Sequence, residues 1–159
     1  MPPQSRRHIL ELKVPPLAIL FLMAALMWLA SWATPAFQIP VPARTFLGAS
    51  FAIAGAVVSA LGVVSFWRAK TTVNPMNPAA SSSLVIGGIY TLTRNPMYLG
   101  FLLVLVGWAV VLSKTLAFLL LPVFIFYMNS FQIEPEERAL TSRFGQEFIT
   151  YKSRVRRWL

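Results

Sequence analysis

Residues 87–100 read Gly-Gly-Ile-Tyr-Thr-Leu-Thr-Arg-Asn-Pro-Met-Tyr-Leu-Gly, and they mark the point at which a polar, turn-rich loop becomes an apolar helix. Asn95 is favoured just before a helix, because its side-chain oxygen can accept a free backbone N–H of the first turn. Pro96 suits the first helical position, where its missing N–H costs nothing. We therefore expect a helix that begins at Pro96 and stays apolar to Leu112, with Arg94 just before its first residue. We interpret the polar residues at this helix start as a candidate functional site. The alternative is an ordinary helix end that Asn95 caps and Arg94 anchors.

The composition is that of a membrane protein. Of the 159 residues, 57% are hydrophobic and only 12% are charged, a balance typical of chains that cross a bilayer. The absence of cysteine excludes disulfides, thiolate metal sites and cysteine nucleophiles. The single histidine, His8, lies in the polar N-terminal segment, and we predict no metal site. The net charge of +9 fits Lys and Arg that flank membrane segments, so we expect the lipid bilayer as a partner and no nucleic acid.

Four apolar segments have about the length that a bilayer-spanning helix needs, namely residues 17–33, 46–67, 96–112 and 116–131. Only Ser113-Lys114-Thr115 separates the last two, which predicts an antiparallel helical hairpin. In the second segment Gly48, Gly55 and Gly62 form a stripe of small residues that suits close helix packing. The predicted fold class is all-α, a multi-pass membrane protein with about four transmembrane helices. We expect residues 1–69, a basic segment and two helices, to form a single integrated domain with residues 70–159.

The basic residues predict the orientation. With four spans both termini lie on one side, which takes every Lys and Arg except Arg44 and Lys114. The positive-inside rule then makes that side cytoplasmic, so the termini and the loop at residues 68–95 are expected there, at the inner membrane if the chain is bacterial.

The C-terminal segment is predicted to be an amphipathic cytoplasmic helix that lies against the membrane or the spans. Its apolar residues recur at helical spacing, with an interruption or bend at Gly145. These residues are Leu140, Phe144, Phe148, Tyr151 and Val155. Glu136 and Glu137 precede this stripe, and a carboxylate near an apolar face needs a cationic partner or must protonate. Arg94 or a positively charged ligand could supply the cation; the alternative is a pair of glutamates favoured by the dipole at a helix start.

The four-span topology places the segment at residues 87–100 and the pair Glu136-Glu137 on the same side of the membrane. The short hairpin returns the chain close to the point at which the third span begins. Tyr90, Arg94, Asn95 and Tyr98 can therefore face Glu136 and Glu137 at the cytoplasmic mouth. Such a site, half aqueous and half lipid-lined, suits a soluble charged cofactor that meets an amphiphilic substrate.

Several motifs together resemble the isoprenylcysteine carboxyl methyltransferase-like family of integral membrane methyltransferases, which also looks related to the phospholipid N-methyltransferases. The resemblance covers residues 70–158, slightly over half of the chain. The motifs are Ser83-Leu84-Val85, Gly88-Ile89-Tyr90, Arg94-Asn95-Pro96-Met97-Tyr98-Leu99-Gly100, Glu136-Glu137, Phe144-Gly145 and residues 151–157.

The resemblance implies a pocket for S-adenosyl-L-methionine between the loop, the start of the hairpin and the C-terminal helix. Its implied cofactor contacts are Ser82, Ser83, Leu84, Val85, Tyr90, Asn95, Pro96, Met97, Tyr98 and Glu136. Glu136 could pair with the ammonium of the methionine moiety. Tyr90 or Tyr98 could face the adenine or, through a cation–π contact, the sulfonium. Methyl transfer from a sulfonium needs positioning and a dry site more than an acid–base residue, so no catalytic residue is assigned.

The candidate substrate-binding residues are Arg94, Gln132 and Glu137. Two departures from the family bear on the acceptor. Asn95 stands where the family has a histidine, and an amide cannot titrate. Gln132 stands where the isoprenylcysteine enzymes have an arginine that holds the substrate carboxylate, and a neutral amide is a poor carboxylate clamp. This argues against a prenylcysteine carboxylate and leaves an amine, a thiol or another lipophilic or small acceptor.

Two other functions fit the sequence. One is an NADPH-dependent membrane reductase of the sterol-reductase type, in which Arg154, Arg156 and Arg157 would hold the 2′-phosphate. The other is a non-catalytic membrane adaptor whose basic tail binds anionic lipid. Retention of NADPH would favour the first, and loss of function on removal of the tail arginines would favour the second.

Overall fold

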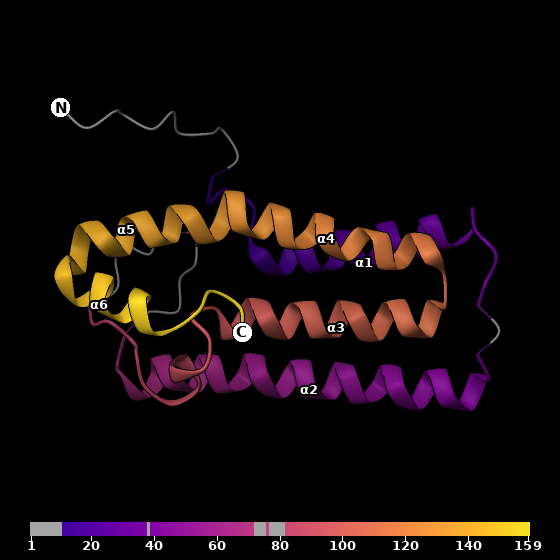
Figure 1. The fold of residues 1–159 in the computed structure, drawn as a ribbon, viewed down its shortest axis with the longest axis horizontal. Coiled ribbons are helices and arrows are strands. Elements are labelled where there is room, and N and C mark those ends of the chain that lie inside the picture. The colour runs from indigo at the N-terminus through magenta and orange to yellow at the C-terminus, as the bar shows by residue number, and fades with distance from the viewer. Residues whose placement is uncertain (1–10, 38, 72–75, 77–81) are drawn as a thin grey trace.

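The computed structural model describes residues 11–37, 39–71, 76 and 82–159. Four helices run side by side (Figure 1): α1 Pro16–Ser31, α2 Val41–Arg68, α3 Pro96–Leu112 and α4 Thr115–Met128. A short 3₁₀ turn, η2 Gly88–Thr91, precedes α3. The π-helical turn η3 Asn129–Ile133 follows α4 and leads into α5 Glu134–Phe144, and α6 Gln146–Arg154 ends the helical part. The described residues contain no strand beyond an isolated bridge between Ala36 and Lys114, so the predicted all-α class is confirmed.

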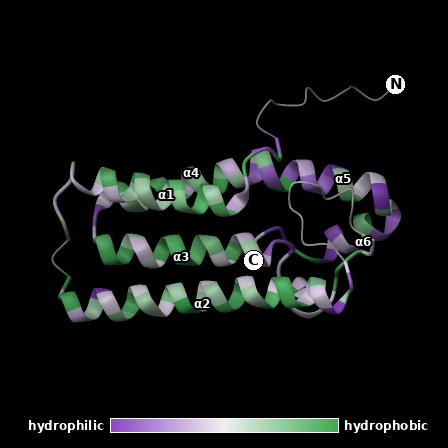
Figure 2. Cartoon of the chain, turned by 180° about the vertical axis from the view of Figure 1, so that it is seen from behind, coloured by the Kyte–Doolittle hydropathy of each residue, from purple (hydrophilic) through white to green (hydrophobic). Residues whose placement is uncertain are grey.

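Two helices are long and apolar enough to cross a membrane, judged by length and composition: α2, and the continuous helix from Thr115 to Phe144. The other two, α1 and α3, are apolar but have only 16 and 17 residues, about 25 Å at 1.5 Å per residue. The predicted count of four spans therefore stays a prediction. Hydrophobic residues dominate the four-helix part, whereas hydrophilic residues gather at the α5–α6 end (Figure 2).

The closest helix contact joins α2 to α3 through glycine. The buried residues of α2 are Gly48, Gly55 and Gly62. A Cβ added to Gly55 would collide with the carbonyl oxygen of Gly100 on α3, and one added to Gly107 would lie 2.5 Å from the carbonyl oxygen of Gly48. The two backbones therefore touch, as small residues on both helices allow. The predicted packing role of the glycine stripe is confirmed.

The hairpin between α3 and α4 also matches the prediction. Ser113 ends α3 in the left-handed region with φ 52°, and α4 begins at Thr115. The turn is covered by the segment after α1, because Lys114 Nζ donates to the carbonyl oxygen of Thr34 at 2.6 Å and the Phe37 N–H donates to that of Ser113 at 2.8 Å. Lys114 and Arg44, in the first turn of α2, thus lie at the opposite end of the bundle from the α5–α6 end.

The C-terminal segment does not begin as a separate tail helix, because α4 continues into α5 without a break (Figure 1). Pro135 has no N–H for the carbonyl oxygen four residues earlier, that of Phe131, and a π-helical turn occupies this point. The N–H of Leu12 donates to the freed Phe131 oxygen at 3.1 Å. The N-terminal segment thus satisfies a backbone group that proline leaves open.

The predicted break at Gly145 is confirmed, since this residue has φ 53° and separates α5 from α6. The apolar stripe packs against the loop before α3. Phe148 and Tyr151 form a buried cluster with Tyr90. The partly buried residues packed against the cluster are Phe66, Leu84, Val85, Ile89, Leu140, Phe144 and Val155. The loop before α3 is thereby held by α6 where it is described; residues 72–75 and 77–81 lie outside the described part.

Candidate functional site

Tyr98 and Glu136 meet where α3 begins and α5 begins. Tyr98 lies in the first turn of α3 and is 4% exposed. Its hydroxyl donates to the Glu136 carboxylate, which lies in the first turn of α5. The hairpin therefore brings these two predicted site residues into direct contact, although 38 positions separate them.

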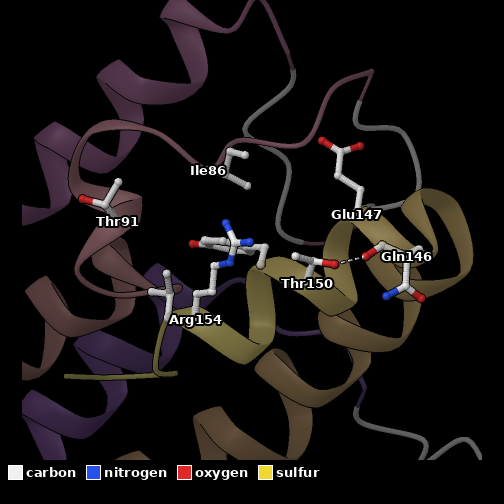
Figure 3. Close-up of a pocket in the computed structure, with 8 residues that line it drawn as sticks. Ile86, Thr91, Gln146, Glu147, Thr150 and Arg154 are labelled. Atoms are coloured by element: carbon white, nitrogen blue, oxygen red, sulfur yellow. Dashed lines mark hydrogen bonds between the residues drawn. The ribbon is translucent and has the colours of Figure 1, made fainter.

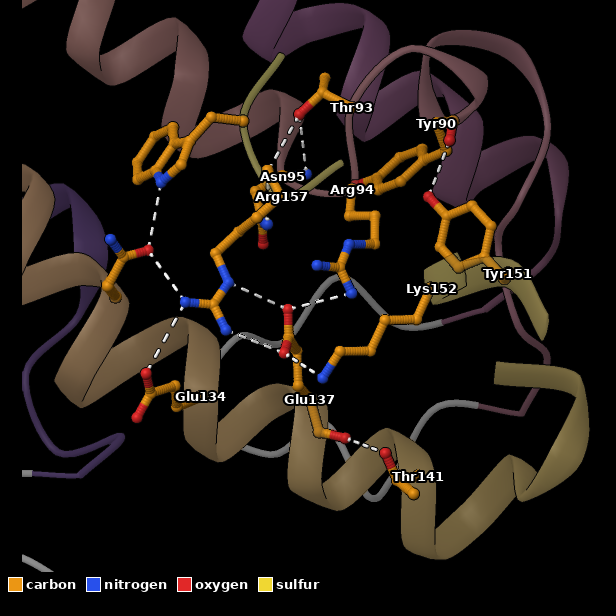
Figure 4. A network of polar contacts seen from close by, with 12 residues as sticks. Tyr90, Thr93, Arg94, Asn95, Glu134, Glu137, Thr141, Tyr151, Lys152 and Arg157 are labelled. Atoms are coloured by element: carbon orange, nitrogen blue, oxygen red, sulfur yellow. Dashed lines mark hydrogen bonds and ion pairs between the residues drawn. The ribbon is translucent and has the colours of Figure 1, made fainter. Parts of the chain in front are cut away.

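Glu137 lies at the centre of a cluster of positive charges (Figure 4). Its carboxylate is within 3.2 Å of Arg94 Nη1, 2.9 Å of Lys152 Nζ and 3.0 Å of Arg157 Nη2. The side chains of Arg94 and Glu137 are each only 10% exposed. Arg94 is the cationic partner that the sequence suggested for the glutamate pair, and it pairs with Glu137.

Burial and charge act on the ionisable groups around this cluster. Burial lowers the pKa of Arg94, while Glu137 opposes that shift. Hydrogen bonds to Glu137 raise the pKa of Arg157. Both guanidinium groups stay charged at neutral pH. Burial raises the pKa of Tyr90, which the charge of Glu136 raises further, and burial also raises the pKa of Tyr151. These two phenols are therefore neutral hydrogen-bond donors across the physiological range.

Glu136 differs from its neighbour Glu137 in its charged partners. Within the described part of the chain, no Lys or Arg forms an ion pair with it. Its recorded polar partner is the neutral phenol of Tyr98. A half-buried carboxylate without a counter-charge is costly. The arrangement therefore fits a ligand that carries a positive group.

The remaining residues of the predicted cofactor pocket lie in the loop before α3 and in the first turn of α3. Tyr90 is buried and meets the Phe66 ring edge-on, with 5.6 Å between centroids. Leu84 and Val85 pack against the same cluster. Pro96 and Met97 face α2, because a Cβ on Gly62 would lie 3.2 Å from Pro96 Cγ and 2.9 Å from Met97 Cγ.

Ser82 and Ser83 are tied to the end of α2. The Ser82 N–H donates to Thr71 Oγ1 at 2.9 Å, and the Ser83 hydroxyl donates to the carbonyl oxygen of Ala69 at 3.2 Å. These bonds fold the loop back toward α2.

Asn95 precedes α3 as expected, but its side chain does not cap the helix. Its Nδ2 instead donates to the carbonyl oxygen of Arg157 at 2.9 Å. The predicted capping bond is therefore wrong: the Asn95 side chain bonds to the backbone near the C-terminus and not to the first turn of α3.

Gln132 is fully buried and bound to the N-terminal segment. Its Nε2 donates to the carbonyl oxygen of Val14 at 2.7 Å. Its Oε1 has no hydrogen-bond partner among the described residues. This predicted substrate-binding residue is therefore engaged on the side of the bundle where the chain enters α1.

Residues 155–158, which we call the C-terminal strap, are the part of the site that sequence reasoning missed. The sequence groups Arg154, Arg156 and Arg157 as one basic cluster, yet Arg154 and Arg156 are exposed while Arg157 bonds to Glu137. Trp158 donates from Nε1 to Asn129 Oδ1 at 3.1 Å and packs against the main core. A tryptophan directly after an arginine run was the available signal that this end is docked.

A pocket of about 550 Å³ lies between the loop before α3 and α6 (Figure 3). Ile86 and Thr91 line its loop side. Its α6 side is formed by Gln146, Glu147, Thr150, Tyr151, Arg154 and Val155. None of the predicted cofactor-binding residues lines this pocket. In the part of the chain that the structure describes, no group of three His, Cys, Asp or Glu could hold a metal ion.

We expect replacement of Tyr151 by Phe to lower the free energy of unfolding by about 1–2 kcal/mol, because it leaves a buried carbonyl unsatisfied. The Tyr151 hydroxyl donates to the carbonyl oxygen of Tyr90 at 2.7 Å, and this bond joins α6 to the loop before α3. Thermal unfolding in detergent measures the change. Tyr127→Phe, which removes the hydroxyl of a half-buried tyrosine in α4, is the control. Equal stability of the two variants would contradict the role of the bond.

Comparison with known proteins identifies the family. Residues 43–147 match the phospholipid methyltransferase family, and the chain belongs to it. An uncharacterized protein of Haemophilus influenzae is 49% identical over 63 residues, which are all of that protein and 40% of this chain. A probable protein-S-isoprenylcysteine O-methyltransferase of Oryza sativa subsp. indica is 32% identical over 111 residues, 70% of this chain and 58% of that one.

A protein-S-isoprenylcysteine O-methyltransferase of Saccharomyces cerevisiae is 29% identical over 114 residues, 70% of this chain and 46% of that protein. The chain thus spans about half the length of the isoprenylcysteine methyltransferases it matches. No solved structure matches it. The resemblance to membrane methyltransferases seen in the motifs is confirmed.

Proposed function

We propose that this protein transfers a methyl group from S-adenosyl-L-methionine to a lipophilic or small acceptor at the cytoplasmic face of a membrane. The observation that carries the proposal is the Glu136 carboxylate, which accepts from Tyr98 where α5 begins and forms no ion pair with a Lys or Arg among the described residues. Its occurrence in a chain of a methyltransferase family gives that carboxylate a cationic ligand to hold. The proposed enzyme is multi-pass, with both termini in the cytoplasm.

The residues fit the cofactor by their chemistry. S-adenosyl-L-methionine has an ammonium group and supplies an activated methyl group on a sulfonium. Glu136 would bind the ammonium, and Tyr98 would hold the carboxylate in place through its hydroxyl. Leu84 and Val85, which are half-buried against Tyr90, offer an apolar surface for the adenosyl part. The protein's part is then to orient the donor and exclude water.

The candidate methyl acceptors are an amine, a thiol or another lipophilic group. The plant and yeast relatives are named for isoprenylcysteine, but Gln132 stands at the position where the family resemblance implies an arginine that holds the substrate carboxylate. Gln132 already donates to Val14, and a neutral amide is a weak partner for a carboxylate. The reductase alternative is weakened, because Arg157 is bonded to Glu137 and does not stand free for a phosphate.

Ligand-dependent thermal stability tests the proposal. We expect S-adenosylhomocysteine to stabilise the purified full-length protein by about 2.7 kcal/mol at a hundredfold excess over its dissociation constant. NADPH is the control and should cause no shift. Stabilisation by NADPH alone would support the reductase instead, and no shift with either ligand would contradict the assigned cofactor.

A further inference from the structure

The C-terminal strap connects the two helix starts that form the Tyr98–Glu136 pair. On the α3 side, the Arg94 N–H donates to the carbonyl oxygen of Arg156 at 3.0 Å. Thr93 Oγ1 and Asn95 Nδ2 both donate to the carbonyl oxygen of Arg157, at 3.2 and 2.9 Å. Three consecutive residues just before α3 are therefore held by the backbone of the strap.

On the α5 side, the strap acts through the Arg157 side chain (Figure 4). Its Nε and Nη2 donate to the two oxygens of Glu137, at 3.2 and 3.0 Å. Its Nη1 lies 3.4 Å from Asn129 Oδ1 in the turn before α5. A two-pronged guanidinium–carboxylate contact fixes orientation as well as distance. Arg157 thus sets how the first turn of α5 is rotated.

The rotation of that turn decides where Glu136 points. Successive residues of an α-helix are about 100° apart around its axis. With Glu137 turned toward the strap, its neighbour Glu136 reaches the phenol of Tyr98. Tyr98 in turn follows Asn95, which the strap holds, by less than one helical turn. Both partners of the pair are therefore placed by one short segment, whose bonds go to residues 93–95 and to Glu137.

We propose that Arg157 is a positioning residue for the methyl-donor subsite, acting through Glu137 to hold Glu136 opposite Tyr98. This inference rests on the proposed function. It assigns to the last residues of the chain a role in cofactor affinity and not in attachment to lipid.

The neighbouring arginine provides a matched control. Arg156 carries the same charge on the same strap, but its side chain is exposed and its contact to Arg94 uses only the backbone. We expect Arg157→Ala in the full-length protein to weaken S-adenosylhomocysteine binding at least tenfold in calorimetry below the unfolding temperature. Arg156→Ala should bind as wild type does. Equal affinity of the two variants overturns the proposal.

A double-mutant cycle separates positioning from general loosening of the fold. If Arg157 acts through Glu136, then Arg157→Ala should cost little further affinity once Glu136 has been replaced by Gln, because coupled residues are not additive. Fully additive losses overturn the positioning role. If Arg157→Ala does not fold, the fallback variant is Arg157→Lys, and its control is Arg156→Lys. Lysine keeps the positive charge but loses the two-pronged geometry.

Hydrogen exchange gives a readout that does not depend on the ligand. We expect Arg157→Ala, but not Arg156→Ala, to speed amide exchange both at residues 94–99 and at residues 134–138. If Arg157→Ala shows this faster exchange but wild type fails to bind S-adenosylhomocysteine, the proposed function is overturned and the mechanical link stands. If wild type binds and the exchange of the two segments is unchanged, the positioning role is overturned alone.

Discussion

Replacing Glu136 by Gln is expected to weaken binding of S-adenosylhomocysteine by about 10- to 100-fold while the protein stays folded. A hydrogen bond between charged groups contributes about 1.5–3 kcal/mol, and each 1.4 kcal/mol is a factor of about ten in affinity. The amide of glutamine keeps an oxygen that can accept from Tyr98. It removes the negative charge that the ammonium of the ligand would meet. Calorimetry on the detergent-purified protein measures the change.

Glu134→Gln is the matched control, because it makes the same chemical change two positions away on α5. The Glu134 side chain is 52% exposed, and its ion pair with Arg157 has a long separation of 3.7 Å. Exposed pairs of this kind contribute little, so its affinity should equal that of wild type. If Glu136→Gln binds as tightly as Glu134→Gln, the carboxylate does not hold the ammonium and the assigned subsite is wrong.

The helices of this protein could be predicted because each one is encoded locally. The start of α3 follows from Asn95 and Pro96, and the bend between α5 and α6 follows from the one glycine in the apolar stripe, Gly145. The close packing of α2 follows from glycines at regular spacing, although only the fold shows that its partner is α3. In each case residues within one segment carry the information, so a periodic pattern is enough to find it.

The detail of the site could not be predicted, since it depends on contacts between distant parts of the chain. The sequence near Glu136 and Glu137 does not show which of the two carboxylates pairs with the cations. In the fold, Glu137 forms ion pairs with Arg94, Lys152 and Arg157. Local preference also gave the wrong bond for Asn95. The side-chain amide of a capping residue can bond instead to a group that the fold brings close, and here the strap brings a carbonyl oxygen to which Asn95 Nδ2 donates.

Replacing Gly100 by Leu is expected to prevent α2 and α3 from packing and to leave little folded protein. Even a single Cβ at this position would collide with Ser59 Oγ and the carbonyl oxygen of Gly55, and would lie 2.9 Å from the Ser59 nitrogen. Backbone atoms cannot move aside as a flexible side chain can, so the helices must separate. Their separation would also break the bond of 3.2 Å from the Ser59 hydroxyl to the carbonyl oxygen of Met97.

Gly100→Ala tests the same contact with the smallest possible change, and here two effects oppose each other. Alanine favours a helix over glycine by about 1 kcal/mol, whereas overpacking typically costs about 1–3 kcal/mol. Because the colliding atoms include backbone, we expect the clash to win and thermal unfolding in detergent to show a net loss of stability. Gly87→Ala is the control: this residue has φ −100° and open space for a Cβ. If Gly100→Leu remains as stable as Gly87→Ala, the two helices do not meet through these glycines.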